Sequence, residues 1–153
     1  KAMDSPGFPL LGACRCGSVG IELAAAPVIT SACHCRGCQR MSASAYSLTA
    51  MVPAEALRVV RGETVRGGIK GPQLDHRFCA ACMTWLFTRI ARTDAFVNLR
   101  PTMFDDQRWS RPFIETMTAE KLPWVQTAAR YSYAGFPPVE DYERLTAEFA
   151  AAR

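Results

Sequence analysis

The chain has 153 residues, of which 49% are apolar and 21% are charged, and these proportions fit one globular domain with its own hydrophobic core. They exclude a disordered chain, and the lack of any uncharged apolar run of 18 residues argues against a membrane-spanning helix. The formal net charge of +4 comes from basic residues scattered along the chain, so the sequence does not indicate nucleic-acid binding. The beginning of the sequence does not have the layout of a signal peptide, which predicts a cytoplasmic protein.

Short apolar or alternating segments recur along the chain and predict β-strands. Proline and glycine turn signals separate these segments, and the spacing favours a β-rich domain over one built from alternating strands and helices. The predicted strands cover residues 18–24, 45–52, 57–60, 74–78, 84–90 and 96–99. A long loop is expected over residues 101–112.

One helix is predicted, at the end of the chain. After Pro137-Pro138, Tyr142, Leu145 and Phe149 follow at positions i, i+3 and i+7, as in an amphipathic helix that packs on a sheet. No repeat or linker divides the sequence, so we expect a single, mainly β domain over residues 4–153.

The seven cysteines all occur in close pairs or in one triplet. They form C-x-C at Cys14 and Cys16, C-H-C-x-x-C over Cys33, Cys35 and Cys38, and C-x-x-C at Cys79 and Cys82. Sulfurs at two corners of a zinc tetrahedron lie about 3.8 Å apart, a spacing that C-x-C meets in an extended segment and C-x-x-C meets around a tight turn. The pattern therefore predicts zinc knuckles. A disulfide framework is the alternative, but the odd number, the short spacings and the absence of an export signal argue against it.

Seven cysteines divide naturally into four ligands that close one tetrahedral site and three that leave a position open on another. Cys33, Cys35 and Cys38, the three-cysteine cluster, lie within six residues and can converge on one ion. The four-cysteine cluster is then formed by Cys14 and Cys16 with Cys79 and Cys82, and it would tie the first strand region to a central hairpin. We expect two Zn²⁺ per chain, which with seven thiolates leave a net charge of about +1.

The two histidines are the candidates for a fourth ligand at the three-cysteine cluster. His34 lies between Cys33 and Cys35, and the alternation that brings those two to one face sends His34 to the other. His76 is expected in a strand, where a hydrogen-bonded structural role is the commoner one, although its position in space is open. We therefore predict that the fourth position stays free for water or substrate.

The motifs resemble those of the glutathione-dependent formaldehyde-activating enzymes (GFA) and their relatives, the centromere-protein V (CENP-V) proteins. The segment 12–19 is similar to the family's opening G-x-C-x-C-G-x-V, 33–38 to its C-H-C-x-x-C, 78–82 to its F-C-x-x-C, and Pro123-Trp124 to its late Pro-Trp pair. Met83 and Ala43 stand where the family commonly has glycine, which leads us to expect that the turns at these positions are shaped differently.

The resemblance implies an Mss4-like β-sheet fold, with a structural zinc on the four-cysteine cluster and a reactive zinc on the three-cysteine cluster. It also implies a carbon–sulfur lyase activity, the reversible joining of glutathione to formaldehyde to give S-hydroxymethylglutathione. In this mechanism the catalytic residues are Cys33, Cys35 and Cys38, whose zinc acts as a Lewis acid, and the substrate thiolate attacks the aldehyde carbon. The partners are a small thiol and an aldehyde.

Other interpretations remain open at this point. Arg36, Arg40 and Arg77 lie beside ligands in the sequence and could bind the carboxylates of glutathione, or they are ordinary surface charges. Both zinc ions could be structural, in a binding or scaffold module without catalysis. Alternatively, the three-cysteine cluster could lose zinc and form a disulfide under oxidation. The aromatic residues support no assignment to the site; they are Tyr46, Trp85, Phe87, Phe104, Trp109 and Trp124.

Overall fold

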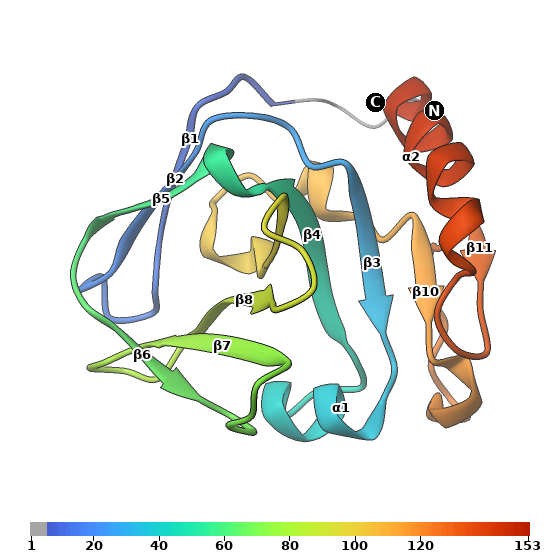
Figure 1. Cartoon of the computed structure of the whole chain (residues 1–153), viewed down its shortest axis with the longest axis horizontal. Helices are drawn as coiled ribbons and strands as arrows, with labels where there is room; N and C mark the ends of the chain where they lie inside the picture. Colours follow the sequence, from blue (N-terminus) through green and yellow to red (C-terminus); the bar gives the residue numbers. More distant parts are fainter. Residues whose placement is uncertain (1–5) are drawn as a thin grey trace.

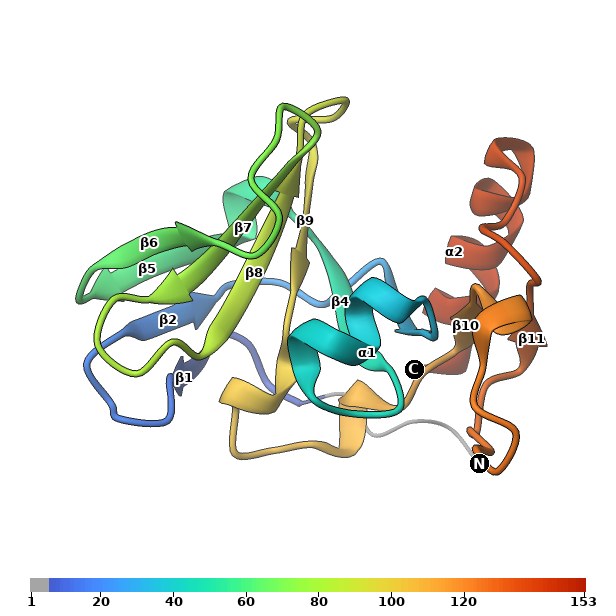
Figure 2. The same ribbon diagram turned by 90° about the horizontal axis from the view of Figure 1, so that it is seen from below.

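Two β-sheets and two α-helices form the part of the chain that the computed structural model describes, residues 6–153 (Figures 1 and 2). The first two residues of the expected domain, 4 and 5, lie outside this range. The strands are β1 (Leu10–Ala13), β2 (Gly20–Leu23), β3 (Ile29–Cys33), β4 (Ser47–Pro53), β5 (Leu57–Arg61), β6 (Thr64–Gly67), β7 (Leu74–Cys79), β8 (Trp85–Ile90), β9 (Phe96–Leu99), β10 (Ile114–Thr116) and β11 (Tyr131–Ser132). The α-helices are α1 (Arg36–Ser42) and α2 (Tyr142–Ala152).

The smaller sheet has the order β1-β2-β5 and the larger one the order β11-β10-β3-β4-β9-β8-β7-β6. Neighbouring strands are antiparallel, except that β10 runs parallel to both β3 and β11. Strands β7 and β8 form a hairpin that pairs Leu74 with Ile90 at one end and Phe78 with Trp85 at the other. The turn of this hairpin brings Cys79 and Cys82 close to the end of β1.

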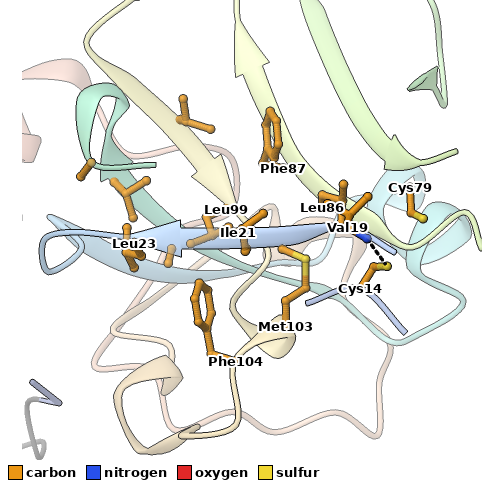
Figure 3. Close-up of a cluster of buried hydrophobic side chains, with 14 of the residues drawn as sticks. Cys14, Val19, Ile21, Leu23, Cys79, Leu86, Phe87, Leu99, Met103 and Phe104 are labelled. Carbon is orange, nitrogen blue, oxygen red and sulfur yellow. Dashed lines mark hydrogen bonds between the residues drawn. The ribbon is translucent and has the colours of Figure 1, made fainter. Parts of the chain in front are cut away.

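The larger of two hydrophobic clusters fills the space between the two sheets. Ile21 and Leu23 of β2 pack there with Leu86 and Phe87 of β8, and all four are at most 1% exposed. Cys14 and Cys79 belong to the same cluster, and Figure 3 shows both at one end of it. One of the two cysteine clusters therefore lies at the edge of the hydrophobic core.

The second hydrophobic cluster joins α2 to the larger sheet (Figure 1). Leu145 and Phe149, which sit on one face of the helix, are fully buried against Ile29, Phe113 and Ile114. This arrangement confirms the predicted amphipathic helix and its packing on a sheet. Within residues 6–153, no helix is long and apolar enough to cross a membrane.

The prediction of a mainly β chain with a C-terminal helix is confirmed, and each predicted strand overlaps an observed one. The expected loop over residues 101–112 contains two short 3₁₀ helices, η2 (Pro101–Met103) and η3 (Arg108–Ser110). The remaining short 3₁₀ helices are η1 (Ala54–Ala56), η4 (Thr118–Glu120) and η5 (Val139–Asp141). Helix α1 and five strands, β1, β3, β6, β10 and β11, were not predicted from the sequence.

Candidate metal centres

The structure brings the sulfurs of the four-cysteine cluster together. All four lie within 4.8 Å of one another. The Sγ atom of Cys16 is 3.6 Å from that of Cys14 and 3.9 Å from that of Cys79, close to the spacing of about 3.8 Å at a tetrahedral zinc site. None of the seven cysteines is in a disulfide. The donor set, its compactness and its free sulfurs fit a closed site for a thiophilic metal ion.

Backbone amides point at these sulfurs. The N–H of Val19 donates to Cys14 Sγ at 3.3 Å (Figure 3), and the N–H groups of Ala81 and Cys82 donate to Cys79 Sγ at 3.4 Å. Burial opposes ionisation of Cys14, but the hydrogen bonds from Val19, Cys79 and Cys16 together outweigh it and lower the pKa of this thiol. The hydroxyl of Thr84 lowers the pKa of Cys82 to about 5. The turns therefore favour the thiolate form of Cys14 and Cys82 that a metal requires, whereas burial and the contacts with Cys14 and Cys82 raise the pKa of Cys79.

The three-cysteine cluster lies at the junction of β3 and α1. Cys33 ends β3, where it pairs with Ser47 of β4 on one side and Thr116 of β10 on the other. Cys35 is the N-cap of α1, and its Sγ accepts a hydrogen bond from the N–H of Cys38 at 3.3 Å. These three sulfurs also lie within 4.8 Å of one another. A strand end and one helical turn thus suffice to assemble the cluster.

The three sulfurs share protons unequally. A hydrogen bond from Cys38, helped by the Thr116 hydroxyl, lowers the pKa of Cys33 to about 5. The same contact raises the pKa of Cys38 far above its ordinary value, because ionised Cys33 holds the proton of Cys38. Such a group fits a cation, which would take the place of the shared protons. Thr116, whose hydroxyl forms a hydrogen bond with Cys33, was not predicted from the sequence.

No other His, Cys, Asp or Glu in residues 6–153 joins the three-cysteine cluster. His34 is fully buried, and its Nε2 forms a hydrogen bond with Glu115 Oε1 at 2.8 Å. His76 is also buried, and its Nδ1 bonds the hydroxyl of Thr88 at 2.8 Å. Both histidines therefore have structural partners, as the alternation argument predicts for His34 and the strand context for His76.

A buried polar network centred on Glu115 lies next to the three-cysteine cluster. Besides His34, Glu115 contacts Lys121 Nζ at 2.9 Å and accepts a hydrogen bond from Ser132 Oγ at 2.7 Å. Burial alone would raise the pKa of Glu115, but these three partners reverse the effect and lower it to about 2. Ionised Glu115 therefore contributes stability that is fully present above 4.5, the ordinary pKa of glutamate, and is lost as the pH falls through about 2.

We expect Glu115→Gln to lower the free energy of unfolding by about 3 kcal/mol at pH 7, because it removes one partner of a buried charge pair. The difference from the unmodified chain should shrink as the pH falls from 4.5 towards 2. Urea denaturation of both proteins at pH 7, 4 and 3 measures this difference in the free energy of unfolding. Acid also protonates the cysteine thiols, but it does so in both proteins, so this effect cancels in the comparison. Exposed Glu55→Gln is the control, with no change expected. A constant difference at all three pH values would contradict the role of Glu115.

A cavity of about 1100 Å³ is lined by residues that adjoin both clusters, although none of the seven cysteines is among its lining residues. The lining includes Ser42 at the end of α1 and Ser47 and Leu48 of β4. It also includes Thr84 and Trp85, which follow Cys82. The lining is completed by Met41, Ser44, Ala45, Tyr46, Met83, Arg100, Thr102, Trp124, Val125 and Gln126. The indole of Trp124 is 73% exposed at this cavity. Of the aromatic residues left unassigned from sequence, Tyr46, Trp85 and Trp124 line it.

A model of the family described as "Glutathione-dependent formaldehyde-activating enzyme" (GFA) matches residues 9–120 of the chain. The chain belongs to the GFA family. Its fold also resembles the crystal structure of a protein from Rhodobacter sphaeroides, with a TM-score of 0.53 and 18% sequence identity. The match covers 81% of this chain and 99% of the other. At that identity the likeness concerns the fold alone.

Met83 and Ala43 occupy the two positions at which the GFA family commonly has glycine. The prediction that the turns there are shaped differently is wrong. Met83 has φ +60°, and Ala43, the C-cap of α1, has φ +50°, so both adopt the left-handed conformation that glycine favours. The turn is retained because local hydrogen bonds close it: the N–H of Met83 donates to Cys79 O at 3.0 Å.

We expect Met83→Gly to stabilise the fold by about 0.5 to 1 kcal/mol. A residue with a side chain costs about 1 to 2 kcal/mol in the left-handed conformation, and glycine avoids this cost. Part of the gain is offset because glycine loses more backbone entropy on folding. The melting temperature should rise by about 2 °C. Met83→Ala retains the strain and is the matched control. Equal melting temperatures of the Gly and Ala variants, measured by differential scanning calorimetry, would contradict the prediction.

The arginines proposed from sequence as carboxylate ligands do not line the cavity of this GFA-family chain. Arg36 and Arg40 are exposed, and Arg77 forms an ion pair with Asp75 at 3.0 Å. The arginine that does line it is Arg100, which the sequence analysis missed. The only signal for Arg100 in the sequence is its place as a charged residue between the apolar Leu99 and Pro101. A charge that is buried in such a place requires a partner.

Proposed function

We propose that the chain is a zinc enzyme that adds a small thiol, such as glutathione, to formaldehyde, in a reversible reaction at the three-cysteine cluster. One observation carries the proposal: three converging sulfurs have no fourth His, Cys, Asp or Glu donor among residues 6–153, and a large cavity lies alongside. Membership of the GFA family supports the choice of thiol and aldehyde. The zinc at the four-cysteine cluster is proposed to be structural.

The residues of the chain fit this chemistry. Zn²⁺ bound to three thiolates would supply a Lewis acid with an open position, which favours the substrate thiol as thiolate. The hydroxyl of Thr116 holds the sulfur of Cys33 in place by a hydrogen bond. The substrate sulfur then attacks the aldehyde carbon, forming the carbon–sulfur bond. The π pair of the carbonyl moves to oxygen, which takes up the proton lost by the thiol.

A binding module with two closed metal sites is the competing function. It needs a fixed fourth donor at the three-cysteine cluster, and the two histidines are engaged with Glu115 and Thr88 instead. The geometry therefore favours the enzyme.

The test is to measure exchange between free and thiol-bound ¹³C-formaldehyde by NMR, in the presence of glutathione and the zinc-loaded protein. Because the adduct also forms without a catalyst, the rate must rise in proportion to protein concentration. No acceleration at any protein concentration would overturn the proposal. Metal analysis of the same sample checks for two zinc ions per chain.

A further inference from the structure

Arg100 is a buried cation at the wall of the cavity. It follows β9, and only 9% of its surface is exposed. No carboxylate forms an ion pair with it in the described part of the chain, and no acidic or other basic residue is among those that line the cavity. A charge that is removed from water without a partner is costly. The negative charges that act on Arg100 are the thiolates of the three-cysteine cluster, and the cavity gives an anionic ligand access to its guanidinium.

The guanidinium of Arg100 is held in a fixed orientation. Its Nη1 donates to Leu48 O at 3.0 Å and to Thr49 Oγ1 at 2.7 Å, and its central carbon lies 3.7 Å from the centroid of the Trp85 ring. The buried Nε has no hydrogen-bond partner. The bonds at Nη1 and the stacking on Trp85 therefore position the group, and Nε keeps a donor that no protein atom uses. The edge of a guanidinium that contains Nε has the geometry to bind a carboxylate with two parallel hydrogen bonds.

The thiolates of the three-cysteine cluster lie close enough to Arg100 to affect its pKa. Burial lowers the pKa of Arg100 to about 10, and the charges of Cys38, Cys33 and Cys35 oppose this effect. Arg100 therefore stays protonated at neutral pH. A thiol compound whose sulfur binds at the cluster would extend its remaining atoms along the cavity, where Arg100 is the one charged lining residue.

We propose that Arg100 binds a carboxylate of the substrate and so selects thiols that carry one. The inference builds on the proposed function, because it assigns the substrate class of that site. Because a contact between Arg100 and a carboxylate affects binding, it can be measured without turnover.

The experiment is calorimetric titration of the zinc-loaded protein with S-methylglutathione and with its diethyl ester. The methyl group blocks the sulfur, so the experiment reports on contacts other than thiolate binding. The acid and the ester differ in their two carboxylates and keep the same amine. We expect the acid to bind at least about 10-fold more tightly than the ester, as a charge-assisted bidentate contact implies.

Arg100→Met and Arg100→Lys should both lose most of this preference, since lysine cannot form the fork or stack on Trp85 in the same way. Arg77→Met, which removes an arginine that does not line the cavity, is the matched control and should retain the preference. Zinc content and melting temperature check that the variants fold. If an Arg100 variant fails to fold, the comparison of acid and ester on the unmodified chain still decides.

Equal binding of acid and ester, or equal weakening of both by Arg100→Met, would overturn the inference. Equal weakening would mean that Arg100 acts by balancing the charge of the thiolates. The two proposals can fail separately. A preference for the acid without acceleration of adduct formation would remove the catalytic function and keep the carboxylate site. Acceleration without the preference would do the reverse.

Discussion

Cys79→Ser is expected to leave the chain unfolded or molten at 25 °C. Cys79 is fully buried, and its sulfur is at once a predicted metal ligand and part of the main hydrophobic cluster. A structural zinc site contributes about 10 to 16 kcal/mol of apparent binding free energy, which is comparable to or larger than the whole stability of a typical domain. Far-UV and near-UV circular dichroism, together with zinc content, measure the result.

Cys16→Ser in the same cluster is the informative companion, because Cys16 is exposed whereas Cys79 is not. A loss of structure in both variants points to the lost ligand, since the Cys16 side chain fills no space in the core. A Cys79→Ser protein that retains both zinc ions and an unchanged melting temperature would contradict the assignment of this cluster as structural.

The second large effect is expected at Cys35. Cys35→Ser should retain the fold and the zinc of the four-cysteine cluster, lose the other zinc, and lower the rate of adduct formation by about 100-fold or more. Replacing groups that only support a metal ligand already costs about 10- to 100-fold, and loss of a ligand should cost at least as much. Metal analysis and the ¹³C exchange measurement give the two readouts.

The choice of serine separates two roles of Cys35. The residue caps α1, and its Sγ accepts the N–H of Cys38. Serine is a good N-cap, whereas Cys35→Ala also removes the cap, at a cost of about 1 kcal/mol in stability. We expect similar rates for the two variants and a lower melting temperature for alanine. Full activity of Cys35→Ser with zinc at both clusters would contradict the proposed site.

The sequence predicted best what local spacing determines. Sulfurs one or two residues apart can face one metal in any extended segment or tight turn, so the two clusters were grouped from sequence as the structure places them. Apolar alternation also marked the central strands. Strand β10 was not predicted, because its three residues are all buried and show no alternation, and because its parallel partner β3 lies more than eighty residues away in the sequence. No local pattern encodes such a partner.

Side chains that support the site were harder to predict for the same reason. Glu115 and Arg100 are charged residues in buried places, and their roles come from neighbours on other strands. Arg36 and Arg40 were chosen because they adjoin ligands in the sequence, yet helix α1 directs them to solvent. Closeness along the chain was a good guide for sulfur ligands and a poor one for charged groups.

The two clusters differ in how much of the chain each of them holds. Opening the three-cysteine cluster requires only the end of β3 and the first turn of α1 to loosen. Opening the four-cysteine cluster requires the β7–β8 turn to separate from the end of β1, which breaches the hydrophobic interior at Cys14 and Cys79. We therefore expect an ion at the first site to exchange with solution by local opening, and one at the second to exchange much more slowly.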